Sequence, residues 1–353
     1  MPFGMHTLLL SLEGGLWAFG DNNDGQLGLG HKEDQKQPVE VPWNGSKPVQ
    51  VDWGSRHSLV LEAEGGVWEA GLSRSSSPSL TFQRVPGIPC IAQVAAGESH
   101  SAAIDTEGGL WVWTSETLLP WASSSPRRVE DLPVLVKVAC GFRFFVAEAE
   151  DGSLCALGFS ECLGLNHSSA MPLVQMQQRS RGPLRCLAAL RGGVILIDSQ
   201  GAVFSVGQKP HDCSYGQLGR PITRKGALEL QRISDIPPMR EISCGNDHSL
   251  CLDEKGGVWT WGRGGSGQLG RGNTGHQFQP ALVPSLQGMS AVVAGSAHSL
   301  VFPENGGLMV FGRNIFGQLG LNHKTDQSTP TLSPLQPACP HSATRTNKKS
   351  ARF

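Results

Sequence analysis

Five histidines in similar local strings are the most conspicuous candidates for chemistry in this chain. Four of them end a Gly-x-x-His string that continues into serine, and His6 lies in a string one residue shorter. The four strings begin and end at Gly54 and His57, Gly97 and His100, Gly245 and His248, and Gly295 and His298. A metal site would need several imidazoles to converge on one ion at about 2 Å. Because the strings recur far apart along the chain, we expect each imidazole to satisfy backbone groups inside its own repeat, beside the neighbouring serine or threonine, and we predict no metal, cofactor or catalytic residue.

Carboxylates fall mostly at or just before glycine turns, where side-chain oxygens commonly bond to the backbone. The residues in question are Glu13, Glu64, Glu107, Asp151, Asp198 and Glu254. Neither a nucleophile elbow (G-x-S-x-G) nor a phosphate-binding loop (G-x-x-x-x-G-K-S/T) occurs in the chain. The sequence therefore predicts no covalent catalysis.

Better candidates for function lie where the repeats depart from one another, because nothing structural demands those residues. Arginine and aromatic side chains are enriched at the energetic centres of protein interfaces. We therefore predict partner contacts among one acidic-amide string and a set of irregular positions, with solvated, drifting loops as the alternative. The string is Asp21, Asn22 and Asn23, and the positions are Arg74, Trp121, Arg127, Arg128, Arg143, Arg179, Arg181, Arg220 and Arg224.

The elements that would position these residues form an internal repeat. A turn of Gly-Gly, Asp-Gly or Gln-Gly recurs seven times at intervals of about fifty residues. An apolar run precedes the turn, and a run with an aromatic residue such as Trp259 follows it. Most copies continue into a Gly-Gln-Leu-Gly loop, a proline-flanked run and a β-branched run. Four short strands per unit and seven units predict an all-β fold, a seven-bladed β-propeller of four-stranded blades.

The combined motif resembles the repeat of the regulator of chromosome condensation family. The matching pattern is G-x-x-H-S-L, then E/D-G-G-x-W-x-W-G, then G-Q-L-G, and it is clearest in Gly245–Gly270 and Gly295–Gly320. The resemblance covers about residues 1–337 and also implies a seven-bladed propeller. Members of the family include an exchange factor for the Ran GTPase, appendages of ubiquitin ligases and kinases, and a plant ultraviolet-B photoreceptor. In the Ran exchange factor a similar Asp-Asn-Asn string lies on a wedge that pushes on the GTPase, whereas the simpler interpretation here is an ordinary repeat loop.

The ends of the chain raise the question of how the ring closes. Repeat units start near residues 4, 54, 97, 141, 190, 245 and 295, and no β-branched strand precedes the first. We expect closure by pairing of N- and C-terminal segments in one blade, with three good strands unless residues 337–344 add a fourth. That blade should be the least stable. Residues 338–353 are predicted to form a basic, disordered tail.

Composition limits the partners further. The formal net charge is -1, which gives no global field for nucleic acid, and no apolar run is long enough to span a membrane. The nine cysteines contain no C-x-x-C pair, which is typical of free thiols in a reducing compartment. We therefore expect a monomeric intracellular protein of the cytoplasm or nucleus. Its leading function is to bind a protein partner through propeller-face loops, as a regulator or adaptor in signalling. Exchange on a Ran- or Rab-like small GTPase is the alternative, and chromatin association is a weaker one.

Overall fold

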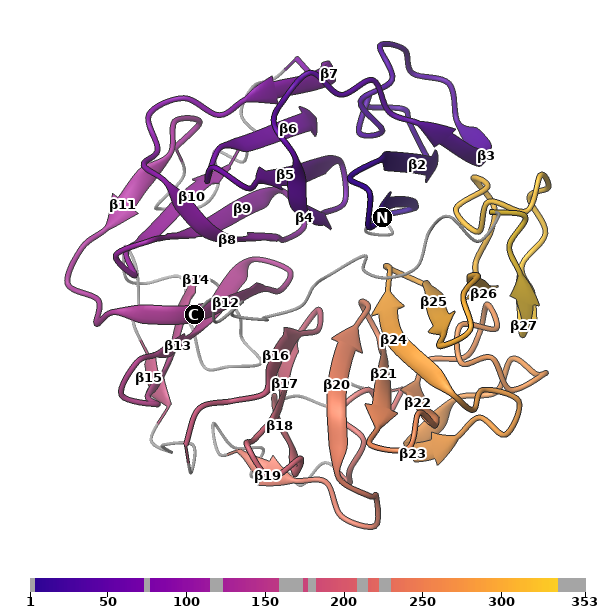
Figure 1. The fold of residues 1–353 in the computed structure, drawn as a ribbon. Coiled ribbons are helices and arrows are strands. Elements are labelled where there is room, and N and C mark those ends of the chain that lie inside the picture. The colour runs from indigo at the N-terminus through magenta and orange to yellow at the C-terminus, as the bar shows by residue number, and fades with distance from the viewer. Residues whose placement is uncertain are drawn as a thin grey trace.

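The computed structural model of the chain is a ring of seven antiparallel sheets (Figure 1). It describes residues 4–72, 77–114, 123–158, 174–176, 182–207, 215–221 and 230–335. In every sheet the strands follow one another in chain order, so each blade is a simple meander. The all-β, seven-bladed propeller predicted from the repeat is confirmed.

The seven blades take their strands from successive parts of the chain. Blade 1 has β1 (His6–Leu10), β2 (Leu16–Gly20) and β3 (Gln35–Glu40); blade 2 has β4 (Pro48–Trp53), β5 (His57–Glu62), β6 (Val67–Gly71) and β7 (Ser79–Arg84); blade 3 has β8 (Ile91–Ala96), β9 (His100–Asp105), β10 (Leu110–Thr114) and β11 (Arg127–Val129); blade 4 has β12 (Leu135–Cys140), β13 (Phe144–Ala149), β14 (Leu154–Gly158) and β15 (Val174–Met176). Blade 5 has β16 (Cys186–Ala189), β17 (Gly193–Ile197), β18 (Val203–Gly207) and β19 (Gln231–Arg232); blade 6 has β20 (Met239–Cys244), β21 (His248–Asp253), β22 (Val258–Gly262) and β23 (Gln277–Leu282); blade 7 has β24 (Met289–Ala294), β25 (His298–Pro303), β26 (Met309–Gly312) and β27 (Gln327–Leu332).

Burial along each blade follows the propeller geometry. The second strand of a four-stranded blade is buried at every residue in β5 and β21, and at all but the last residue in β25, because both of its faces pack on neighbouring blades. Such strands therefore need near-continuous apolar sequences rather than alternation. Outer strands such as β3 are partly exposed and polar, and the hydrophobic core accordingly lies between blades.

Ring closure differs in one respect from the expected arrangement. Blade 1 has three strands, as predicted, and all three come from the N-terminal segment. The C-terminal unit builds its own four-stranded blade, so within the described residues the two ends of the chain do not share a sheet. They meet instead across the packed boundary of blades 7 and 1, where Leu8 and Phe19 share one apolar cluster with Leu300 and Val310. Residues 337–344 lie outside the described part of the chain.

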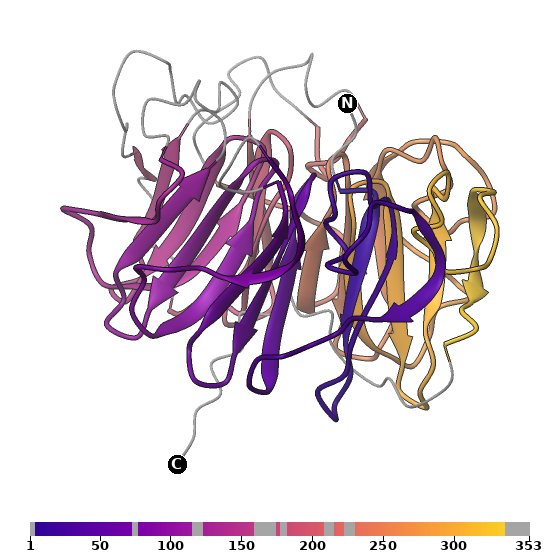
Figure 2. The same ribbon diagram turned by 90° about the horizontal axis from the view of Figure 1, so that it is seen from above.

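The meander gives the ring two different faces (Figure 2). One face, which we call the loop face, carries the connections between first and second strands and between third and fourth strands of each four-stranded blade. The opposite turn face carries the glycine turns between second and third strands. Blade 1 has no strand equivalent to the inner strand β4, so its glycine turn joins β1 to β2 and its β2–β3 connection lies on the loop face. Among the described residues, no helix is long and apolar enough to cross a membrane.

Candidate functional site

Four of the five repeat histidines, His6, His57, His248 and His298, bond to hydroxyl groups of the next blade around the ring. In each case the imidazole Nε2 faces a serine or threonine oxygen, and every partner is fully buried. The pairs are His6 with Ser58 Oγ at 2.8 Å, His57 with Ser101 Oγ at 3.0 Å, His248 with Ser299 Oγ at 3.0 Å, and His298 with Thr7 Oγ1 at 2.9 Å. We expected each imidazole to find its partners within its own blade, and for these four histidines this expectation is wrong. Their Nε2 partners lie on the adjacent blade, because blade packing brings the hydroxyl group of the neighbouring strand to within hydrogen-bond distance.

The direction of these bonds follows from a second contact. Ser58, Ser299 and Thr7 each donate a hydroxyl proton to a backbone carbonyl of a Gly-Gln-Leu-Gly loop, namely that of Gln26, Gln268 or Gln318. A hydroxyl has one proton to give, so in these three pairs the histidine Nε2–H is the donor. The imidazoles are therefore neutral links between blades.

Burial explains why the imidazoles remain neutral. Desolvation lowers the pKa of His6, His100, His248 and His298 to about 3, and that of His57 to about 4. The preceding glycine of each string is equally structural. A Cβ atom at Gly54, Gly97, Gly245 or Gly295 would collide with the imidazole three residues later. The Gly-x-x-His spacing therefore serves blade packing.

Trp259 also has a structural contact, at a turn on the opposite face. Its Nε1 donates to Asp253 Oδ2 at 2.9 Å, while Asp253 Oδ1 accepts from the backbone of Lys255 and Gly257. Asp105 and Trp111 repeat the arrangement in blade 3. Asp253 and Asp105 thus organise turns, although the sequence singled out their neighbours Glu254 and Glu107; of the residues named from the sequence, Asp198 accepts from the backbone N of Gln200 and Ala202.

The Asp21–Asn23 string lies in the loop-face connection between β2 and β3. Asn22 is fully buried, and its Nδ2 donates to the carbonyls of His31 (2.8 Å) and Glu33 (3.2 Å). Its Oδ1 accepts from Leu27 N at 3.0 Å. Asn22 therefore holds the loop together and lies out of reach of a partner.

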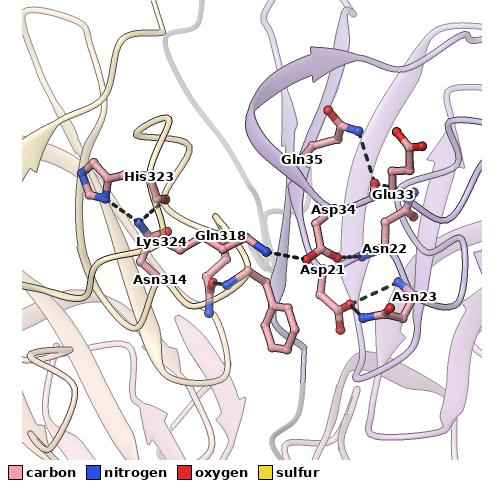
Figure 3. Close-up of polar contacts among 11 residues, drawn as sticks. Asp21, Asn22, Asn23, Glu33, Asp34, Gln35, Asn314, Gln318, His323 and Lys324 are labelled. Atoms are coloured by element: carbon pink, nitrogen blue, oxygen red, sulfur yellow. Dashed lines mark hydrogen bonds and ion pairs between the residues drawn. The ribbon is translucent and has the colours of Figure 1, made fainter.

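The equivalent loop of blade 7 has the same construction. Asn314 Nδ2 donates to His323 O at 2.9 Å, and Asn314 Oδ1 accepts from Leu319 N at 2.9 Å. Figure 3 shows the two loops side by side, joined by Lys324 Nζ and Asp34 Oδ2 at 2.9 Å. The Asp-Asn-Asn string thus belongs to an ordinary repeat loop.

Asp21 and Asn23 lie closer to the surface of the same loop. Asn23 is exposed, and it donates from its backbone N (3.1 Å) and its Nδ2 (2.5 Å) to Asp21 Oδ1. Burial raises the pKa of the Asp21 carboxyl, and the charges of Asp34 and Asp24 add to the effect. Next to them Asp24 accepts two bonds from Arg56, at 2.6 and 2.9 Å. This part of the loop presents charged and amide groups to solvent.

A second group of loop-face residues surrounds the centre of the ring, where residues from all seven blades meet. Ser55, Phe142 and Asn246, which each follow a repeat glycine, line a pocket of about 50 Å³ there together with Arg191, which follows Leu190. Arg143 and Arg191 each place the guanidinium carbon 5.0 Å from the centre of the Phe142 ring. We call Phe142, Arg143 and Arg191 the arginine stack.

The arginine stack lies where the histidine links are interrupted. In blade 4, Phe144 and Phe145 replace the histidine and serine of the string. His100 of blade 3 consequently packs edge-on against Phe145, with ring centroids 4.7 Å apart. Sequence reasoning singled out Arg143 but missed Phe142 and Arg191, although the loss of the repeat string at 190–193 marked the place.

The remaining predicted arginines fall in different places. Arg127 and Arg128 lie on β11, the exposed outer strand of blade 3. Arg220 is tied to blade 5 by a bond from its Nε to Ser205 Oγ at 2.9 Å. The other predicted positions lie outside the described residues: Arg74, Trp121, Arg179, Arg181 and Arg224.

Comparison with known proteins gives consistent matches. The model of the regulator of chromosome condensation (RCC1) repeat matches residues 13–61 and 255–302, and a second model of that repeat matches 239–268. The ultraviolet-B receptor UVR8 of Arabidopsis thaliana is 26% identical over 286 residues, which are 80% of this chain and 56% of that protein. The RCC2 homolog of Xenopus laevis is 29% identical over 290 residues, 79% of this chain and 42% of that protein. The chain thus spans about half the length of these curated relatives.

A solved structure supports the same architecture. Prp20p from Saccharomyces cerevisiae aligns with a TM-score of 0.81 over 93% of this chain and 88% of that chain. The two sequences are 20% identical, so the likeness concerns the fold.

Proposed function

We propose that the chain, which contains repeats of the regulator of chromosome condensation (RCC1) type, is a protein-binding propeller that uses its loop face. It would act as a regulator or adaptor of a signalling partner, with no covalent chemistry of its own. Function in such folds is carried by surface sites rather than by the fold itself. The proposal is for an intracellular protein of the cytoplasm or nucleus, acting as a monomer.

One observation carries the proposal. Polar, charged and aromatic side chains outside the histidine–hydroxyl links gather on the loop face, in the Asp21–Asp24 loop and in the arginine stack. By contrast, repeat histidines such as His6 and His298 are buried and make hydrogen bonds to the next blade, so they are not available to a partner. A rigid ring that presents irregular loops is suited to recognition, because little ordering is needed on binding.

Affinity capture with matched surface variants tests this proposal. Asn23→Arg and Ile315→Glu alter exposed residues of the loop face, whereas Leu12→Glu alters an exposed residue of the turn face. We expect the loop-face variants to lose a partner that the wild-type protein and Leu12→Glu both recover. Equal recovery by all four proteins, with unchanged thermal unfolding, would contradict the use of the loop face.

Nucleotide exchange on a small GTPase is the second candidate. Its support is the similarity to the regulator of chromosome condensation of Xenopus laevis, 24% identical over 317 residues, and to Prp20p, whose binding to Gsp1p and histones has been described. Exchange would proceed by binding the nucleotide-free GTPase, without bond-making in the propeller. The burial of Asn22 in an ordinary loop weighs against a wedge at this position.

A nucleotide-release assay separates the two candidates. Ran-, Rab- and Rho-type GTPases would be loaded with a fluorescent nucleotide and mixed with micromolar propeller. Acceleration of release by the wild type but not by Asn23→Arg would support exchange, and no acceleration would eliminate it for that panel. Chromatin association, the weaker alternative, would require binding to nucleosomes with a steep dependence on salt.

A further inference from the structure

Each Gly-Gln-Leu-Gly loop packs against the outer strand of the next blade around the ring. A Cβ atom on the first glycine of the loop would collide with a backbone Cα of that strand. The strand residues in this position are Leu80 for the loop of blade 1, Phe278 for blade 5, Ser328 for blade 6 and Lys36 for blade 7. The four contacts are equivalent, so their differences can be compared directly.

Three of these contacts are closed by a backbone hydrogen bond from the second residue after the loop. The bonds run from Gly30 N to Leu80 O at 2.8 Å, from Gly272 N to Ser328 O at 2.8 Å, and from Asn322 N to Lys36 O at 2.9 Å. The equivalent residue after the blade 5 loop is Pro221, which has no N–H to donate. No N–H of residues 215–221 bonds to the Phe278 carbonyl, so this contact stays open.

The open contact also has an aromatic surface. Phe278 is 58% exposed, although it is large and apolar. The residue before the first glycine of the same loop is Tyr215, whose ring packs edge-on against exposed His276 with centroids 4.8 Å apart. At the closed contacts the equivalent pairs contain at most one aromatic residue, and they are Asp24 with Leu80, Ser266 with Ser328, and Phe316 with Lys36. We call Tyr215, Pro221, His276 and Phe278 the open seam.

The closed contacts show which kind of ligand the open seam fits. Their carbonyls accept from a backbone N–H, and at blade 1 the donor segment runs antiparallel to the strand, as the bridge between Leu29 and Thr81 shows. A peptide that adds to the edge of a sheet supplies the same kind of N–H. The exposed Phe278 ring beside the carbonyl takes an apolar side chain. An extended apolar segment meets both requirements.

We propose that the open seam binds an extended apolar segment of the protein partner. One backbone N–H of the segment donates to the Phe278 carbonyl, and an apolar side chain lies against the Phe278 ring. Strand β23 begins at the β22–β23 connection, so the seam belongs to the loop face. This inference rests on the proposed protein-binding function and names the chemistry of the partner.

Fluorescence anisotropy on the full chain tests the inference with a defined probe. The probe is a fluorescein-labelled seven-residue peptide of alternating Thr and Val with an amidated C-terminus. We expect the wild-type protein to bind it, and Phe278→Ser, which copies blade 7, to raise the Kd at least about tenfold through the loss of apolar surface. Leu332→Ser is the matched control, because it removes a similarly exposed apolar side chain from the outer strand of blade 7.

Pro221→Gly tests the hydrogen bond itself, since it makes residues 216–221 identical to residues 267–272. The amide introduced at position 221 should donate to the Phe278 carbonyl and compete with the peptide. The Kd should then rise about fivefold, which is the effect of one hydrogen bond. Slow hydrogen exchange of that amide verifies the closure. A fully N-methylated peptide keeps the side chains, has no N–H and should lose affinity for the wild type.

Several outcomes would overturn the inference. They are no binding of the peptide by the wild type, an equal loss of affinity in Leu332→Ser, an unchanged Kd in Pro221→Gly with a protected amide, or equal binding of the N-methylated peptide. Tighter binding of a ten-nucleotide single-stranded DNA would assign the aromatic rings to base stacking instead. Self-association that Phe278→Ser abolishes would assign the seam to a second copy of the chain.

The proposed function fails separately from this inference. Its test uses Asn23→Arg, Ile315→Glu and Leu12→Glu, which lie in blades 1 and 7 and leave the open seam intact. Partner capture that depends on those residues, together with an inert peptide, would retain the function and remove the seam from it.

Discussion

Two kinds of joint hold neighbouring blades together in this ring. Four joints, 6/7, 7/1, 1/2 and 2/3, contain a buried histidine bonded to a hydroxyl of the next blade. We call these the polar joints. At joint 3/4 a histidine packs on Phe145 instead, and joints 4/5 and 5/6 contain no repeat histidine. We call these three the apolar joints.

The comparison shows that the repeat tolerates the loss of its polar link when apolar volume replaces it. At joint 4/5, Phe144 fills the place of the histidine and joins a cluster with Val194 and Leu196 of the next blade. Exchanging a buried hydrogen-bonded pair for well-packed apolar groups is close to neutral in stability, whereas removing one partner is costly. The sequence around the apolar joints is therefore free to vary, and the arginine stack lies there.

Acid should most strongly separate the joints that contain a buried histidine, which are the four polar joints and joint 3/4 with His100, from joints 4/5 and 5/6, which contain no repeat histidine. The unfolded state binds more protons between pH 6.5 and about 3, since each folded-state pKa lies below the usual value of 6.5. Stability is therefore full above pH 6.5 and is lost as the pH falls through this window. At pH 5 each buried histidine should cost about 2 kcal/mol.

Hydrogen exchange at pH 7 and pH 5, corrected for the intrinsic rate, would check this expectation. Strands β21, β25, β1 and β5, which contribute to the polar joints, should lose protection before β17 of blade 5. Equal loss in both regions would show that the joints do not differ in acid sensitivity. A His57→Gln variant should have a flatter pH profile of thermal unfolding than the wild type.

A methyl group at a repeat glycine should damage a polar joint directly. The Cβ of Gly295→Ala would collide with His298 Cε1 in a fully buried site, so we expect destabilisation of about 3 kcal/mol. Gly265→Ala is the control, because its Cβ has only Arg263 Nε nearby, at 3.8 Å, and the φ angle of Gly265 is not positive. Urea unfolding of both variants measures the difference. Similar midpoints for the two would show that the imidazole can move aside at little cost.

Removing one hydroxyl should have a smaller effect. Thr7→Val keeps the shape and leaves both His298 Nε2 and the carbonyl of Gln318 without their partner, so we expect a loss of about 2 kcal/mol. Thr81→Val, on the exposed side of β7, should change stability by less than about 0.5 kcal/mol. A loss at Thr7 no greater than at Thr81 would make the polar joints energetically equivalent to surface contacts.

The sequence alone was sufficient for the architecture because the repeat encodes local rules. Glycine turns, apolar runs and the Gly-Gln-Leu-Gly loops predict strands and their order, and seven copies that must bury both faces predict a ring. The repetition also indicated that histidines such as His248 are structural. It could not indicate that their partners lie in the next blade, since that depends on how far packed sheets stand apart.

The candidate site was less accessible to sequence reasoning. Asn22 looked exposed because its neighbours are polar, yet the loop folds around its amide. Phe142 and Arg191 belong to different repeats, and both lie where the histidine string is lost. Only the closed ring brings them together at its centre, so the sequence indicated Arg143 and gave no reason to pair it with Phe142 and Arg191.

The smallest expected effect concerns blade 1, which lies between two polar joints yet has only three strands. The two joints contribute hydrogen bonds worth about 1 kcal/mol each. In blade 2 the inner strand β4 forms a ladder of backbone hydrogen bonds with β5 and packs against it. Blade 1 has no such inner strand and therefore lacks these bonds and contacts. Because the missing strand outweighs the two joints, we expect β1–β3 to exchange faster than β20–β23 at pH 7, by about 1 kcal/mol of local stability. Slower exchange in β1 than in β21 would reverse the ranking and make the polar joints, rather than the number of strands, the main determinant of local stability in this ring.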